Sequence, residues 1–129
     1  MVKLLTFVLL IFANLSAMAL TPKKIIDTNG EVIDLLVKNQ KIYATTDSGK
    51  VDIFDLKTKQ LLQEIKFAKI KDIFGDLNNV RVFSVDVMDD KILLASQGTK
   101  GFSRVYLFYD NKLHKVFDEK DQMAIMKVR

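Results

Sequence analysis

The chain has 129 residues, with 20 basic and 16 acidic side chains, one His, one Pro, no Trp and no Cys. The absence of Cys excludes a disulfide scaffold, a zinc–thiolate site, an iron–sulfur cluster, covalent c-type haem attachment and a cysteine nucleophile. The net charge of +4 is mild, and a nucleic-acid-binding protein would need basic residues clustered on one face. Hydrophobic residues make up 49% of the chain, which is typical of a globular protein.

Residues 1–19 are predicted to be a Sec signal peptide. Lys3 is their only charged residue, and the apolar run that follows it is shorter than the ~20 residues of a membrane-spanning helix. Ala17 and Ala19 form the small-residue pattern that signal peptidase accepts, which predicts cleavage before Leu20. We therefore expect a periplasmic mature chain that does not bind the membrane. An uncleaved membrane anchor and a buried first strand are the alternatives.

The rest of the chain alternates short runs rich in Val, Ile, Tyr, Phe and Thr with turn-forming residues. Such runs predict β-strands, and their spacing of about ten residues is too short for crossover helices, so the strands should pair antiparallel. The first four strands are expected at Glu31 to Val37, Lys41 to Thr46, Lys50 to Asp55 and Gln60 to Phe67. Four more are expected at Val82 to Val87, Lys91 to Ser96, Arg104 to Phe108 and Leu113 to Phe117.

The second group of four strands repeats the first, since Lys41-Ile42 returns 50 residues later as Lys91-Ile92. Four strands in a repeat of about 40–50 residues are typical of a β-propeller blade. We therefore expect an all-β fold for residues 20–129, an incomplete β-propeller of antiparallel four-stranded blades. Its parts are blade one at 31–67, a linker at 68–80, blade two at 81–117 and the first strand of a third blade at 122–129.

The stretch Lys66 to Asn79, which joins the two blades, carries apolar residues at the spacing of one helix face, namely Phe67, Ile70, Phe74 and Leu77. Lys66, Lys69 and Lys71 lie off that stripe. One interpretation is a presented basic helix or loop that docks an acidic partner. The other is a crossover whose apolar stripe packs on the neighbouring blades.

The loop at 97–104 adds two cations, Lys100 and Arg104, to the possible partner surface formed by Lys66, Lys69 and Lys71. Its glycines do not make it a phosphate-binding loop, because that motif ends in Gly-Lys-Ser/Thr and leads into a helix. We expect a hairpin loop between two strands here.

No arrangement of side chains predicts catalysis, and we predict no catalytic, cofactor-binding or metal-binding residues. His114 is expected to be a solvated strand residue, because a metal site needs three or four ligands and no acidic cluster lies beside it. Asp34 and Asp86 are expected in the innermost strands at different heights, since Asp86 aligns with Leu36. They should therefore line the channel or bond to turns rather than act as an acid–base pair.

The stretch Ala44 to Thr58 resembles the middle hairpin of a WD40-type blade, with Phe54-Asp55 where that family has Trp-Asp. The family's usual Gly-His pair is missing. A more specific resemblance lies in the order of several segments, namely Pro22-Lys23-Lys24, Val51 to Leu56, Lys69 to Asp72, Gly75-Asp76, Ser84-Val85-Asp86 and Ser96-Gln97-Gly98. This order looks like the NapL-type accessory proteins of the periplasmic nitrate reductase system.

That resemblance implies a WD40-like propeller in the periplasm that supports maturation of, or electron supply to, the nitrate reductase. Members of that family are longer, so the resemblance also implies a truncated member. The leading hypothesis is thus a non-catalytic interaction protein with a protein partner, possible self-association through open sheet faces, and no nucleic acid. The alternatives are a fragment of a quinoprotein-like enzyme, against which the lack of Trp weighs, and a truncated gene product without independent function.

Overall fold

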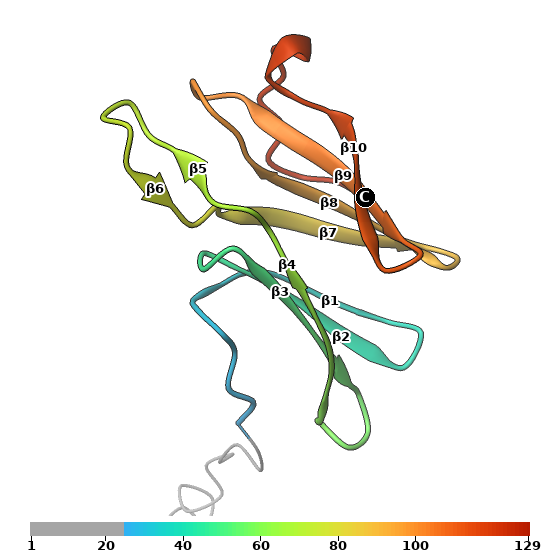
Figure 1. The fold of residues 1–129 in the computed structure, drawn as a ribbon. Coiled ribbons are helices and arrows are strands. Elements are labelled where there is room, and N and C mark those ends of the chain that lie inside the picture. Colours follow the sequence, from blue (N-terminus) through green and yellow to red (C-terminus); the bar gives the residue numbers. More distant parts are fainter. Residues whose placement is uncertain (1–24) are drawn as a thin grey trace, which may run out of the picture.

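The computed structural model describes residues 25–129, so the predicted signal peptide, with Ala17, Ala19 and Leu20, lies outside the described residues. Two four-stranded antiparallel sheets dominate the described part (Figure 1). The first contains, in spatial order, β1 (Val32–Lys38), β2 (Lys41–Thr46), β3 (Lys50–Asp55) and β4 (Leu61–Lys66). The second contains β7 (Val82–Met88), β8 (Lys91–Gln97), β9 (Ser103–Tyr109) and β10 (Lys112–Phe117).

Short turns connect the strands of each sheet and fix their pairing. Asn39 and Gln40 join β1 to β2 with φ angles of 51° and 61°, and Asp110 and Asn111 join β9 to β10 with 50° and 57°. Two successive positive φ angles define the type I′ turn, whose twist matches that of a two-stranded hairpin. The prediction of an all-β fold built from antiparallel four-stranded sheets is confirmed.

The two sheets also share details of backbone geometry 50 residues apart. A register shift between Val32 and Asp34 in β1 recurs between Val82 and Ser84 in β7. At the start of each sheet, one backbone N–H crosses from the end of the second strand: Asp47 N donates to Glu31 O at 3.0 Å, and Gln97 N donates to Arg81 O at 2.8 Å. The repeat in the sequence therefore corresponds to a repeat in the structure.

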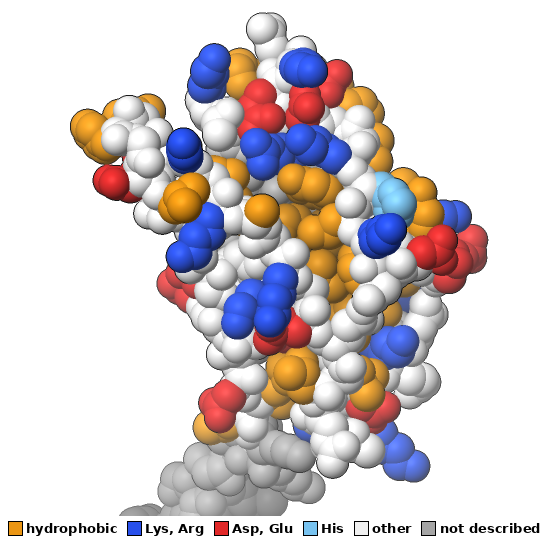
Figure 2. Space-filling model, in the orientation of Figure 1, with side chains coloured by type: hydrophobic (Ala, Val, Ile, Leu, Met, Phe, Trp, Pro, Cys, Tyr) orange, Lys and Arg blue, Asp and Glu red, His pale blue; other side chains and the backbone are white. Residues whose placement is uncertain are grey.

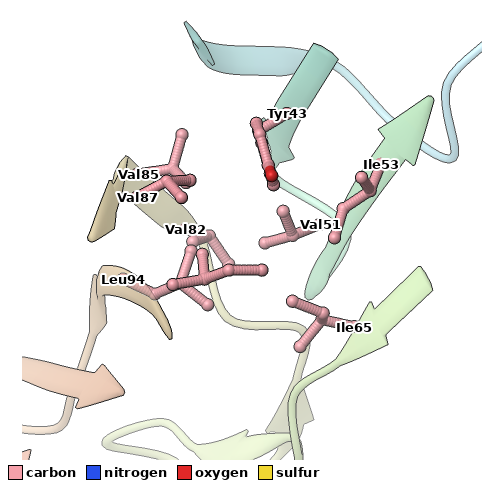
Figure 3. Packing of buried hydrophobic residues seen from close by; sticks show 9 residues of the cluster. Tyr43, Val51, Ile53, Ile65, Val82, Val85, Val87 and Leu94 are labelled. Carbon is pink, nitrogen blue, oxygen red and sulfur yellow. The ribbon is translucent and has the colours of Figure 1, made fainter. Parts of the chain in front are cut away.

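The hydrophobic core lies between the two sheets, where β7 packs on β1 and β2 (Figure 3). The first sheet contributes Tyr43, Val51, Ile53 and Ile65, and the second contributes Val82, Val85, Val87, Ile92 and Leu94. Each such side chain gains about 1.5–3 kcal/mol when it is fully buried. Burial of these side chains where one sheet covers the other is therefore a large contribution to stability.

The segment between the sheets is a hairpin, so the predicted helical stripe is wrong. β5 (Ile70–Lys71) pairs with β6 (Leu77–Asn78). Asp72 and Gly75 explain the difference: Gly75 N donates to Asp72 O at 3.1 Å, and Gly75 has a φ of 85°. A type I turn followed by a left-handed glycine is the usual three-residue hairpin loop, and it overrides the apolar spacing.

The segment 122–129 forms no β-ladder, which corrects the strand expected there. The 3₁₀ turn η1 (Glu119–Asp121) precedes it, and the chain then runs back along the second sheet (Figure 1). Its backbone makes single contacts instead of a repeating pattern: Ser103 N donates to Met123 O at 2.7 Å, and Val128 N donates to Ser84 Oγ at 3.1 Å. Among residues 25–129, no helix is long and apolar enough to cross a membrane.

Candidate functional site

The β5–β6 hairpin projects away from both sheets (Figure 1). Its tip is apolar. Ile73 is 90% exposed, Phe74 83% and Leu77 60%. In Figure 2 hydrophobic side chains gather at the outer end of this projection. Large exposed apolar side chains that cluster on a protruding element are typical of protein-binding sites.

Asp72 holds the tip in one shape. Its carboxylate accepts hydrogen bonds from Phe74 N at 2.8 Å, Asp76 N at 2.9 Å and Asn78 Nδ2 at 2.9 Å. The backbone N–H of Asp76 contributes most to holding the pKa of Asp72 below its usual range. The carboxylate therefore stays ionised at neutral pH, and Ile73 and Phe74 are presented by a preorganised turn.

The base of the hairpin is anchored to the two sheets. Ile70 and Val80, on either side of it, are buried. Phe67, just before β5, meets the ring of Tyr106 edge to face, with 5.3 Å between the ring centroids. Because these contacts fix the base, the exposed tip has a defined direction.

A groove of about 780 Å³ separates the hairpin from the loop between β8 and β9. Its hairpin side is lined by Ile70, Lys71, Asp72, Ile73, Asn78 and Asn79, and its loop side by Gln97, Gly98, Thr99, Lys100 and Gly101. Its volume lies within the range of about 300–1,000 Å³ that is usual for pockets that hold small ligands.

Glu119 of η1 holds the loop side of this groove in place. Its Oε1 accepts hydrogen bonds from Thr99 N at 2.8 Å, Thr99 Oγ1 at 3.1 Å and Arg104 Nε at 2.7 Å. Burial alone would raise the pKa of Glu119, but the Thr99 N–H and the Arg104 guanidinium lower it to about 2. A Cβ at Gly98 would come within 2.8 Å of Phe102 O, so the loop requires glycine there.

The structure brings together two of the five cations in the predicted partner surface. Lys71 and Lys100 line opposite sides of the groove. Lys69 is exposed just before β5, and Lys66 is exposed with its Nζ 3.5 Å from Glu64. Arg104 is largely buried in its ion pair with Glu119, so its charge stabilises the β8–β9 loop rather than the predicted partner surface.

Asp34 forms a second polar cluster where β1, β7 and the C-terminal segment meet. Its carboxylate accepts hydrogen bonds from Ser84 Oγ at 3.0 Å, Val85 N at 3.1 Å and Lys127 Nζ at 2.9 Å. The Arg129 guanidinium adds two more, at 3.2 and 3.3 Å. Burial alone would raise the pKa of Asp34, but Arg129 and Lys127 hold it well below its usual range.

The other two side chains that the sequence singled out also have partners. Asp86 lies 3.7 Å from Lys38 Nζ. His114 stacks on Tyr109 with 3.8 Å between ring centroids, and its Nε2 is buried without a hydrogen bond. His114 thus lies in a strand as expected, but it is half-buried rather than fully solvated. Among the described residues, no group of three or more His, Cys, Asp or Glu side chains could hold a metal ion.

Sequence reasoning missed the exposure of the hairpin tip, although one signal for it was present. Asp at the first position and Gly at the fourth position of Asp72-Ile73-Phe74-Gly75 are typical of a type I turn. Comparison with protein-family models and with curated proteins found no match to this chain.

Proposed function

We propose that this chain is a non-catalytic interaction protein that binds a protein partner through the tip of the β5–β6 hairpin and the adjoining groove. The observation that carries this proposal is the pair of nearly fully exposed apolar side chains, Ile73 and Phe74, on a turn that Asp72 preorganises. A preorganised loop loses little conformational entropy on binding, so its buried area contributes more fully to affinity.

The expected contact has an apolar centre and a basic rim. Burial of Ile73 and Phe74 by a partner would contribute about 1.5–3 kcal/mol each, which is the range of binding hot spots. Lys71 and Lys100 line the adjoining groove with Ile73, and Lys69 is exposed just before β5. Such cations favour a partner with acidic side chains around an apolar pocket, since complementary charges at the rim accelerate association.

The resemblance to NapL-type accessory proteins suggests which partner to test. On that basis the chain acts in the periplasm, and its partner is a component of the periplasmic nitrate reductase system that needs help in maturation or electron supply. Acidic surface on that component, next to an apolar depression, would match the hairpin.

The test is complementation of a gene deletion with matched variants. Deletion is expected to lower periplasmic nitrate reductase activity, and the wild-type gene to restore it. The Ile73→Ser/Phe74→Ser variant is expected to fold normally but fail to restore activity. Val116→Ser is the control and should restore activity. It changes an exposed apolar residue of β10 that belongs to neither the hairpin nor the groove.

The possible failures of this test have different meanings. If deletion leaves nitrate reductase activity and maturation unchanged, the assignment to that system is wrong. If deletion lowers activity but the hairpin variant complements as well as wild type, the partner system is right and the proposed site is wrong. Binding of the purified chain to purified nitrate reductase components, measured by calorimetry, then identifies the partner directly.

A further inference from the structure

Each four-stranded sheet has two faces, and the internal repeat makes the faces of the two sheets comparable. We call front the face that carries Leu36, Tyr43 and Ile53 in the first sheet, residues paired across β1, β2 and β3. The matching row across β7, β8 and β9 consists of Asp86, Leu93 and Leu107. The opposite face of each sheet is its back face, because side chains alternate along a strand.

Within the molecule, the front face of the first sheet packs on the back face of the second. Tyr43, Val51, Ile53 and Ile65 come from the front face, and Val85, Val87, Ile92 and Leu94 come from the back face. The back face of the first sheet and the front face of the second are therefore the two faces that remain outside this core.

The back face of the first sheet repeats the apolar pattern of the back face that is covered. The covered face has Val85, Val87, Ile92, Phe108 and Leu113, and the corresponding rows of the first sheet have Leu35, Val37, Ile42, Phe54 and Leu61. Phe54 is buried, but Leu35 is 56% exposed and Val37 54%. The back face of the first sheet is therefore open at β1, while at β3 and β4 Asn29 donates hydrogen bonds to Asp52 and Glu64 on this face.

The contact that Lys38 makes between the two sheets is polar, whereas the residues at the equivalent positions on the two outer faces are apolar. Inside, Lys38 Nζ donates to Val87 O at 2.6 Å and lies 3.7 Å from Asp86. In the 50-residue repeat, Met88 is the equivalent of Lys38 and is 49% exposed. Val37 is the equivalent of Val87. A polar contact in the core interface therefore corresponds to an apolar pair at the outer faces.

The front face of the second sheet is only partly covered by the C-terminal segment. Val128 N reaches Ser84 Oγ, which places that segment over the inner end of the sheet. Met88 at one end of β7 and Phe117 in β10 remain accessible, and Met126 adds an exposed apolar side chain on the segment itself.

We propose that copies of this chain dock head to tail. The front face of the second sheet of one copy lies on the back face of the first sheet of the next copy. The contact repeats the packing already present between the two sheets of one copy, so Met88 of one copy lies against Val37 of the next. Such an interface is heterologous, and it extends by addition of copies until a ring closes.

The test measures self-association of the full chain by sedimentation velocity across a range of concentrations. Wild type is expected to self-associate, and either Val37→Lys or Met88→Lys is expected to raise the dissociation constant at least about tenfold, because an unpaired ammonium would be buried against an apolar surface. Ile73→Lys is the matched control: it changes an exposed apolar residue on the hairpin, outside both faces, and should associate like wild type.

The mixture of the two variants distinguishes head-to-tail docking from a symmetric dimer. Val37→Lys keeps an intact second sheet and Met88→Lys an intact first sheet, so an equimolar mixture should form a 1:1 complex that grows no further. Since the chain has no Cys, Val37→Cys and Met88→Cys provide a check: the mixed pair should form disulfide-linked dimers faster than either alone.

Three results would overturn the proposal. One is a wild-type chain that stays monomeric at every concentration, which would mean that the back face is covered within one copy. The second is a mixture of the two Lys variants that stays monomeric. The third is faster cross-linking of either Cys variant with itself than of the mixed pair, which indicates a symmetric contact. None of these results depends on whether the hairpin binds a partner.

Discussion

Replacement of Asp34 by Asn removes the charge at the point where both sheets and the C-terminal segment meet. The carboxylate is 9% exposed and accepts hydrogen bonds from β7 and from two basic side chains, those of Lys127 and Arg129. Asn keeps the shape and one acceptor oxygen, which can still receive the Val85 N–H. Its amide group, however, presents a donor to the two cations.

The expected loss follows from the exposure of the partners. A hydrogen bond to a charged group contributes about 1.5–3 kcal/mol when both groups are shielded from water. Lys127 and Arg129 are each about half exposed, so water replaces much of the hydrogen bonding that they lose when Asp34 is replaced. We therefore expect Asp34→Asn to lower the free energy of unfolding by about 1–2 kcal/mol, or the melting temperature by roughly 4–12 °C for a domain of this size.

The assay is urea denaturation of wild type and Asp34→Asn at several pH values. Because the pKa of Asp34 is lowered in the folded state, the ionised carboxylate stabilises the fold, and this contribution is complete above about pH 5. It is lost progressively as the pH falls below that value. The difference between wild type and Asp34→Asn should therefore be largest at neutral pH and shrink toward pH 2.

Asp86→Asn is the matched control, since it makes the same change on β7, the first strand of the other sheet. Within residues 25–129, Asp86 has one ion pair, with Lys38 at 3.7 Å, and a pair of this kind contributes about 0–1 kcal/mol. If Asp34→Asn is no more destabilising than Asp86→Asn, or if its effect does not depend on pH, the assignment of Asp34 as the central ionic contact is refuted.

Two further changes test the loop anchor and the core. Glu119→Gln should cost about 1–2 kcal/mol at neutral pH, because it weakens the bond from Arg104 and leaves the loop side of the groove less ordered. This difference should fade as the pH falls from about 4.5 toward 2, and urea denaturation at both ends of that range checks it. Leu94→Ala, at a fully buried position between the sheets, should cost about 2–5 kcal/mol in the same assay, and a loss below 1 kcal/mol would mean that the sheets do not pack as described.

The eight long strands could be predicted from sequence because each lies between strong turn signals. Asn39-Gln40 and Asp110-Asn111 adopt the left-handed conformations that Asn and Asp tolerate, and the β-rich runs between such turns pair with their neighbours. Local chemistry thus determines most of the two sheets. The hairpin at 70–78 was missed because four apolar residues happened to match a helical period, whereas one Asp–Gly turn determined the backbone.

The candidate site was predictable only in part, because it depends on contacts between distant segments. Lys71 and Lys100 were singled out for their charge, but only the folded chain places them across one groove. The exposure of Phe74 contradicts one of the two interpretations of this stretch, the one in which its apolar stripe packs on the neighbouring blades. Nothing in the local sequence of Asp34 indicates that Lys127 and Arg129 would reach it.

The Asp34 cluster also orders the steps of folding. Every strand pair in the two large sheets joins neighbours along the chain, so each sheet can form from local contacts as soon as its four strands are available. Lys127 and Arg129, in contrast, bind a carboxylate 93 and 95 residues earlier. During synthesis on a ribosome, both sheets would emerge before these cations do. Until then, the Asp34 carboxylate would lie at the junction of the two sheets without its two cationic partners. Closure of the junction then follows formation of both sheets, and a nascent chain paused before residue 127 would hold its two sheets in looser contact than a chain that includes Lys127 and Arg129.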